Sequence, residues 1–144
     1  MVKKKSKLKK LEEKIAELNN KWKRALADYQ NLEKRTVQEK TEFVKFASAA
    51  LLDKLLFILD GLEKCQAHFK DKGLDLVLSQ FKKVLESEGL EEIKTEGEEF
   101  DPQLMDAVEM IKGKKNYVIE VILKGYKLNN KILRPAKVKV GTGG

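Results

Sequence analysis

Apolar side chains recur at alternating spacings of three and four along the first third of the chain. The recurrence starts at Leu8, and the positions between the apolar ones are mostly charged or amide residues. This is the heptad pattern of a left-handed coiled coil, whose single narrow stripe needs a second helix to cover it. The predicted dimer seam consists of Leu8, Leu11, Ile15, Leu18, Trp22, Tyr29, Leu32 and Phe43. The rest of the chain is too short to cover this length, so we expect a second copy, or another protein, to lie along the seam.

Beyond Ala50 the apolar stripe becomes wider, as expected where a helix packs against more than one neighbour. The pattern predicts one nearly unbroken helix from about Leu8 to Leu62, a stretch without proline. A break near Gly73 precedes a second, shorter helix, and Gly89 is well placed to cap its C-terminus. If the short helix folds back on the wide stripe in each of two chains, the result is a four-helix bundle.

The periodicity changes to alternation in the last third of the chain. Apolar and polar residues alternate over 117–123 and 132–140, which predicts two strands with a turn at Asn129–Asn130 between them. Phe100–Pro102 indicates a turn or a helix entry. The fold class expected is α+β, with a long N-terminal coiled-coil helix. The expected parts are a disordered basic lead at 1–7, a helical dimerisation domain (stalk plus four-helix bundle) at 8–88, a small C-terminal, mostly-β domain at 89–140 and a flexible tail at 141–144.

Charge is divided unevenly along the chain, whose net charge is +7. Residues 1–10 hold six lysines and no acidic residue, and residues 111–144 carry a net charge of +8. Basic segments at both ends are compatible with a coiled-coil nucleic-acid-binding protein, and the seam alone is compatible with a dimeric structural scaffold. A solvated tail and a basic protein-binding face explain the same charges. We prefer that interpretation, and expect no nucleic-acid partner, because runs of charge are usually solvated.

The sequence contains no arrangement of reactive side chains that predicts catalysis. The single histidine, His68, lies near the predicted helix break, and the single cysteine, Cys65, continues an apolar helical spacing. One histidine and one cysteine do not make a common zinc site, and no glycine-rich phosphate loop is present. We therefore expect no enzymatic activity, metal, cofactor or small-molecule substrate. The cysteine usage and the lack of a long apolar run favour a cytoplasmic protein without membrane contact.

Several short segments occur in an order and spacing that resemble the GrpE family. They are Phe100-Asp101-Pro102, Ala107-Val108, Gly125-Tyr126, Leu133-Arg134-Pro135-Ala136 and Val138-Lys139-Val140, with Asp28-Tyr29-Gln30-Asn31-Leu32 in the long helix. The resemblance extends over roughly residues 25–140. It implies a homodimeric co-chaperone that acts as adenyl-nucleotide exchange factor of a DnaK-type chaperone. In that family a β module binds the nucleotide-binding domain of the chaperone and opens its cleft, so that ADP leaves.

The resemblance also implies which residues contact the chaperone. They are Phe100, Ile122, Lys131, Arg134, Pro135 and Val140 on the β module, and Arg35, Phe46 and Gly73 on the helical part. For Phe100, Ile122 and Val140, a place in the core of the β module is an equally good interpretation, and Phe46 is also a seam position. Lys131 and Arg134 are the better contact candidates, because charges are rarely buried unpaired.

The seam is weakest between about Ala25 and Glu39, where Ala25, Thr36 and Glu39 bury little apolar area. We expect this stretch to melt before the bundle on heating and thereby to reduce exchange activity. The charges that flank the seam do not favour parallel over antiparallel pairing, so the parallel orientation rests on the resemblance.

Overall fold

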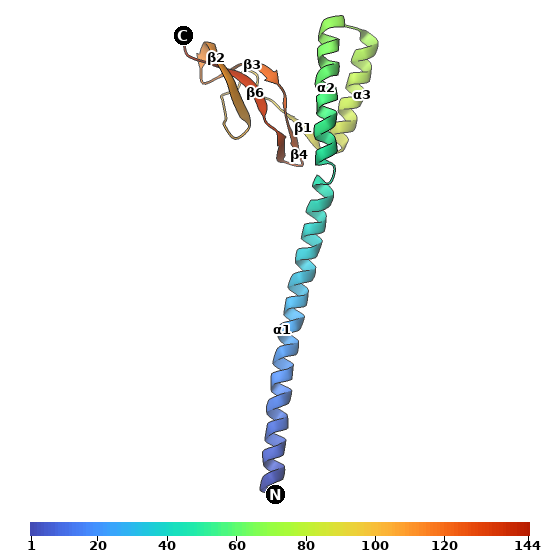
Figure 1. The fold of residues 1–144 in the computed structure, drawn as a ribbon, viewed down its shortest axis with the longest axis vertical. Helices are drawn as coiled ribbons and strands as arrows, with labels where there is room; N and C mark the ends of the chain where they lie inside the picture. The colour runs from blue at the N-terminus through green and yellow to red at the C-terminus, as the bar shows by residue number, and fades with distance from the viewer. The chain divides into compact units, whose positions relative to one another are not determined.

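The computed structural model describes residues 1–144, and its first element is a helix of 45 residues. This helix, α1 (Val2–Phe46), is drawn in blue to cyan in Figure 1. It has no buried residue, and the predicted seam side chains are between 50% and 73% exposed. Residues 2–7, predicted as part of a disordered lead, are helical in the structure. The chain divides into two compact units, Met1–Val44 and Lys45–Gly144. The first unit is thus a single helix whose apolar stripe is uncovered within its own chain.

A turn at Ala47–Ser48 separates α1 from the next helix, and the heptad pattern does not reveal it. A helix break frees carbonyl groups that would otherwise accept intrahelical hydrogen bonds. The Asn129 side chain satisfies one of them, because its Nδ2 donates to the Lys45 carbonyl oxygen at 2.9 Å. One nearly unbroken helix was predicted, and the structure has two helical segments joined by a short turn.

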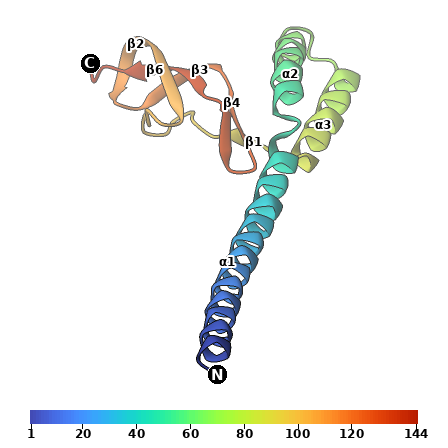
Figure 2. The same ribbon diagram turned by 60° about the horizontal axis from the view of Figure 1, so that its bottom comes forward.

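Two antiparallel helices follow the break, and they lie side by side in Figures 1 and 2. They are α2 (Ala49–Phe69) and α3 (Lys72–Ser87). Asp71 caps the start of α3, since its Oδ1 accepts a hydrogen bond from the Leu74 amide at 2.8 Å. Gly89 follows the end of α3 as predicted, and its φ is +92°. Glycine adopts this conformation without the strain that a side chain would cause. The predicted helix break and second helix are confirmed.

The six strands form two three-stranded sheets. The inner sheet has the order β1-β4-β5, with β1 (Leu90–Ile93), β4 (Gly125–Leu128) and β5 (Lys131–Arg134) all antiparallel. The outer sheet has the order β2-β6-β3, with β2 (Met105–Lys115) parallel to β6 (Ala136–Gly141) and β3 (Val118–Leu123) antiparallel to it. We call both sheets together the β module.

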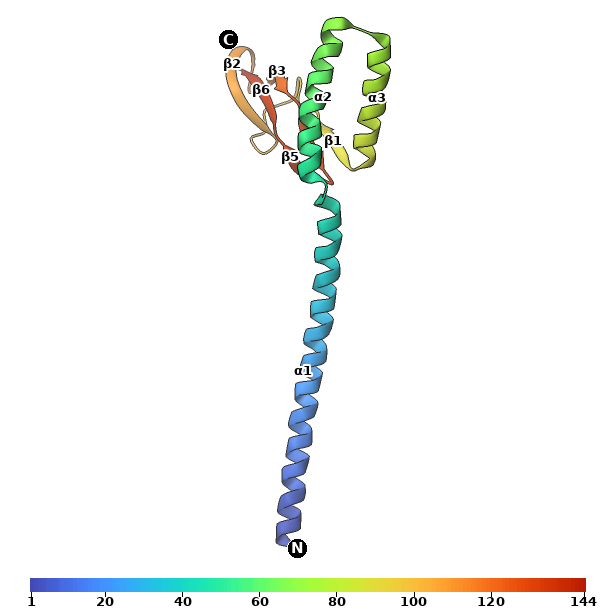
Figure 3. The same cartoon turned by 45° about the vertical axis from the view of Figure 1, so that its right-hand side comes forward.

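Each sheet belongs to a different hydrophobic core. The inner sheet contributes Leu90, Tyr126 and Leu128 to a core that it shares with α2 and α3, and β5 lies next to α2 in Figure 3. The helices contribute Leu52, Leu56, Leu59, Leu78 and Leu85 to that core. The outer sheet has its own core, made of Met105, Val118, Ala136, Val138 and Val140. The inner sheet is thus joined to the helices by apolar packing, whereas the outer sheet is packed around β6.

Three of the six strands were not predicted from the sequence. The segment after Phe100, interpreted as a turn or helix entry, turns within a few residues and then forms β2, of which only Met105 is buried. β1 and β4 are four residues long and give no clear alternation. β3, β5 and β6 confirm the two predicted strands, except that Pro135 interrupts the second one and sends its halves into different sheets.

No helix in the structure combines the length and the apolar character that crossing a membrane requires.

Candidate functional site on the β module

The β4–β5 hairpin turns through two asparagines next to the end of α1. Asn129 and Asn130 both have positive φ, as a tight two-residue hairpin turn requires. The turn brings Lys131 to the start of β5, where its Nζ lies 5.2 Å from the centre of the Phe46 ring. Phe46 is half-buried and packs against the core of α2 and α3. Lys131 and Phe46, two predicted contact residues, therefore lie together at the helix break.

The other predicted contact residues on the β module differ in their accessibility. Ile122 on β3 is 45% exposed and is available to a partner. Phe100 is partly buried against the core of the outer sheet, and Pro135 is half-buried between β5 and β6. Val140 is only 2% exposed and belongs to that core, which matches the core interpretation given for it above.

The edge strands of the outer sheet expose apolar side chains that sequence reasoning did not select. Val108 and Met110 on β2 and Ile119 on β3 are exposed, in addition to Ile122. β2 and β3 are the two edges of this sheet, because β6 lies between them. An unpartnered edge with exposed apolar residues is a surface that can bind another protein. Identifying it requires the strand order, which pairs β2 with a segment far away in the sequence.

Arg134 is not a free surface charge. Its Nη1 and Nη2 donate to Oδ2 and Oδ1 of Asp60 on α2, at 2.7 and 3.0 Å. Its Nε and Nη2 also donate to the Lys124 carbonyl oxygen, at 3.0 and 2.7 Å. The Arg134 and Asp60 side chains are only 15% and 14% exposed. The guanidinium group is therefore occupied by partners within its own chain.

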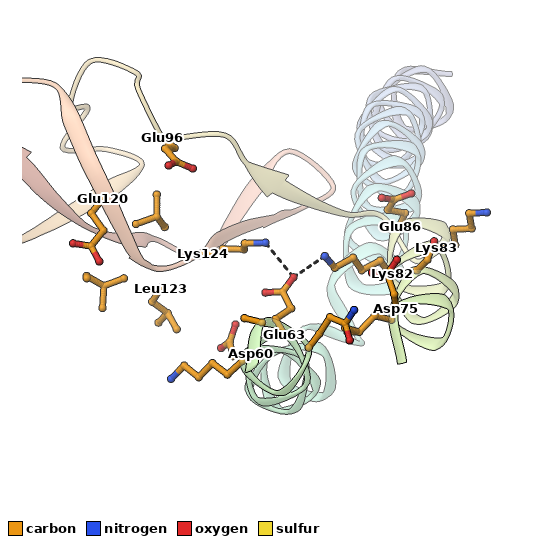
Figure 4. A pocket seen from close by; sticks show the side chains of 17 residues that line it. Asp60, Glu63, Asp75, Lys82, Lys83, Glu86, Glu96, Glu120, Leu123 and Lys124 are labelled. Carbon is orange, nitrogen blue, oxygen red and sulfur yellow. Dashed lines mark hydrogen bonds and ion pairs between the residues drawn. The ribbon is translucent and has the colours of Figure 1, made fainter. Parts of the chain in front are cut away.

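A second group of charges lies beside this ion pair. The Glu63 carboxylate on α2 accepts contacts from Lys82 Nζ on α3 at 2.6 Å and from Lys124 Nζ at 3.1 Å, as Figure 4 shows. Burial on its own raises the pKa of Glu63, but hydrogen bonds from the two lysines outweigh it and hold the pKa below its ordinary value. Burial likewise lowers the pKa of Lys124, and the hydrogen bond to Glu63 reverses this and raises it. Both groups are therefore held in their charged forms.

These charges line one side of an open groove of about 940 Å³ between α2, α3 and β3. Acidic and basic side chains both line it, and Glu63, Lys82 and Lys124 pair with one another (Figure 4). The structure contains no cluster of three or more His, Cys, Asp or Glu residues that would hold a metal ion. The groove thus has neither a reactive centre nor a single sign of charge.

The remaining predicted contact residues lie on the helices. Arg35 on α1 is exposed and lies 3.6 Å from Glu39, one helical turn away. Gly73 lies in the first turn of α3, beside the capping residue Asp71. Both are accessible, and neither is near the β module in sequence.

The sequence model of the GrpE family matches residues 1–142, which is nearly the whole chain. The chain belongs to the GrpE family. The resemblance inferred from the short segments is thereby confirmed, and so is the α+β fold class expected from the sequence.

Individual GrpE proteins from distant microorganisms match over most of their length. GrpE of Brachyspira hyodysenteriae is 39% identical, and the match covers 95% of this chain and 75% of that protein. GrpE of Methanosphaera stadtmanae is 38% identical, with 88% and 77% covered. GrpE of Clostridioides difficile is 39% identical, with 92% and 68% covered.

GrpE is the nucleotide-exchange factor of DnaK, and it acts as a co-chaperone without being an enzyme. Its task is to change the affinity of another protein for a nucleotide. The relevant features of this GrpE chain are therefore the surfaces that can bind a partner and the contacts that hold those surfaces in place. The exposed edges of the outer sheet are a candidate for such a surface, and the charged contacts of Arg134 and Lys124 connect β5 and the residue before β4 with α2.

Proposed function

We propose that two copies of this GrpE chain pair in parallel, along the α1 seam and through one face of α2 and α3. The seam residues of α1 are at least half exposed, and α2 and α3 expose a further set of large apolar side chains. That set consists of Leu51, Phe57, Ile58, Phe69, Leu76, Val77 and Val84. Exposed apolar area of this extent usually marks an interface. Pairing would join α2 and α3 of both chains into a four-helix bundle, in line with the helical dimerisation domain proposed for residues 8–88.

We further propose that the β module of one chain binds the nucleotide-binding domain of the DnaK-type chaperone and opens its cleft. A ligand shifts a conformational equilibrium only by its difference in affinity for the two states. If GrpE binds the open state more tightly, ADP affinity falls by the same factor, because the coupling is reciprocal. ADP then leaves and ATP enters, with no covalent step on GrpE.

Within the predicted contact set, exposure separates two roles. Ile122, Lys131, Arg35 and Gly73 are exposed and are proposed to touch the chaperone directly, with Phe46 beside Lys131. Phe100, Pro135 and Val140 are half-buried or buried, and support the surface from beneath. The cytoplasmic location expected from the cysteine usage stays a prediction.

The observation that carries the proposal is the uncovered apolar stripe of α1, in a chain whose family is known. Sedimentation at micromolar concentration is expected to return twice the mass of the 16.5 kDa chain. Release of a fluorescent ADP analogue from a DnaK-type chaperone is expected to accelerate at substoichiometric amounts of the protein.

The contact surface is tested with one charge reversal and its control. Lys131→Glu is expected to slow the release, whereas Lys9→Glu, on a polar face of α1, leaves it unchanged. A helical monomer in sedimentation would refute the pairing. Unaltered release with Lys131→Glu would refute the proposed surface.

A further inference from the structure

The outer sheet is connected to the inner sheet at two short crossovers, besides the longer segment 94–104 that joins β1 to β2. Lys124 alone joins β3 of the outer sheet to β4 of the inner sheet, and Pro135 alone joins β5 to β6 in the opposite direction. Gly125 and Ala136 directly follow the two crossover residues, and their backbones lie close together. A Cβ atom added to Gly125 would lie only 2.5 Å from the backbone nitrogen of Ala136. Since the outer sheet has its own core, its direction depends largely on how these crossovers are held.

One side chain holds both crossovers to the helices. Arg134 directly precedes the Pro135 crossover, and its guanidinium donates two hydrogen bonds to the Lys124 carbonyl oxygen. The same guanidinium forms a two-pronged ion pair with Asp60 on α2. Such a planar fork fixes orientation as well as distance, and a lysine cannot reproduce it. We call Asp60, Lys124 and Arg134 the crossover clamp.

A second set of contacts secures the same point. The Lys124 ammonium group lies 3.1 Å from Glu63 Oε1 on α2 and 3.7 Å from Glu92 Oε1 on β1. Glu63 is also bound by Lys82, so that α3 joins the network (Figure 4). The Lys124 crossover is therefore held through its backbone by Arg134 and through its side chain by α2 and the inner sheet.

We infer that Arg134 is a positioning residue: the crossover clamp fixes the direction of the outer sheet relative to α2 and α3, and Arg134 does not itself touch the chaperone. This inference rests on the proposed function of the outer sheet. A sheet that turns freely on its crossovers holds the binding-competent direction for only part of the time, which weakens binding by that fraction. It also lets the chaperone close its cleft while GrpE is bound, which reduces the coupling between the two ligands.

The first test separates a positioning role from a direct contact. Asp60→Asn keeps the shape of Asp60 but removes the charge that holds Arg134, and Arg134→Lys keeps the charge but removes the fork. Each variant is expected to slow ADP-analogue release at a fixed, subsaturating concentration by at least about threefold. The double variant is expected to be no slower than the slower single variant, because both changes break the same Arg134–Asp60 ion pair. Arg24→Lys, at an exposed position of α1 with no ion pair, is the matched control and is expected to release ADP at the parent rate.

If Arg134 bound the chaperone directly, Asp60→Asn would free it for that contact. Parent-like release with Asp60→Asn, or additive losses in the double variant, would therefore overturn the inference. Release is compared at a temperature where circular dichroism shows every variant to be fully helical, so that a loss of folding does not enter the comparison.

The second test measures the direction of the outer sheet without the chaperone. Spin labels are attached at Lys72→Cys on α3 and Lys112→Cys on β2, in a Cys65→Ser chain diluted with unlabelled protein. Asp60→Asn and Arg134→Lys are expected to broaden the distance distribution between the labels, and Arg24→Lys to leave it unchanged. Slower release with unaltered distances would overturn the inference. Failure of the parent protein to accelerate release would refute the proposed function instead, and the distances would still decide whether the clamp orients the sheet.

Discussion

A close backbone approach between the two crossovers gives a quantitative prediction for Gly125→Ala. The added methyl group would lie 2.5 Å from the backbone nitrogen of Ala136 and 3.0 Å from both its Cα and Cβ. These atoms belong to Ala136, which is fully buried and cannot move aside as the end of a flexible side chain does. Overpacking of this kind costs about 1–3 kcal/mol. Because Gly125 and Ala136 flank the two crossovers, the cost is expected to weaken the attachment and pairing of the outer sheet first.

Amide hydrogen exchange of β6 measures this cost locally. If β6 exchanges through opening of the outer sheet, a cost of about 1–3 kcal/mol accelerates exchange of residues 136–141 by about five- to 150-fold. Gly144→Ala makes the same chemical change where no atom lies within 4 Å, and is expected to leave exchange unaltered. Parent and variant are compared at equal chain concentration, because the proposed pairing of copies would make stability concentration-dependent. If β6 in Gly125→Ala exchanged within twofold of the parent rate, the steric argument would be wrong.

Three further outcomes are expected. Leu56 is fully buried between α2, α3 and the inner sheet, so Leu56→Ala should lower the free energy of unfolding in urea by about 2–5 kcal/mol, and a loss below about 1 kcal/mol would contradict the shared core. The pKa of Glu63 is held below its ordinary value, so its ion pairs stabilise the fold above that value and are lost as pH falls through the lowered pKa. Between about pH 5 and pH 3 the parent should therefore lose more unfolding free energy than Glu63→Gln, and equal losses would show that the contacts with Lys82 and Lys124 contribute nothing. Glu39→Leu should raise the temperature of an early helical transition seen by circular dichroism, whereas a single transition at an unchanged temperature would exclude early melting of the α1 seam.

The helical part of the fold was largely predictable, because its signals are local. The heptad spacing from Leu8 onward, the cap at Asp71 and the glycine at position 89 each act within one or two helical turns. The break at Ala47–Ser48 has no such signal, since neither residue disrupts a helix strongly by itself. The contact seen at the break comes from Asn129, whose side chain donates a hydrogen bond to the carbonyl oxygen of Lys45. These two residues are 84 positions apart in the sequence.

The β module was predictable only where strands alternate clearly. β3 and β6 alternate because each has one buried face, whereas β2 is mostly exposed and its residues give little periodic signal. Arg134 was selected as a contact candidate on the argument that charges are seldom buried unpaired. The argument is sound, but the partner is Asp60, and sequence spacing alone does not identify a pairing between α2 and β5.

The strand order of the outer sheet has a consequence for biosynthesis. β6 is the final strand of the chain, yet it is the central strand to which both β2 and β3 are hydrogen-bonded. The helices and the inner sheet are complete once Arg134 has left the ribosome, whereas β2 and β3 still lack the strand that unites them. A nonsense mutation just before Ala136 would therefore leave the helices and the inner sheet without a folded outer sheet. If two copies pair through the helices as proposed, such a subunit is expected to be dominant-negative.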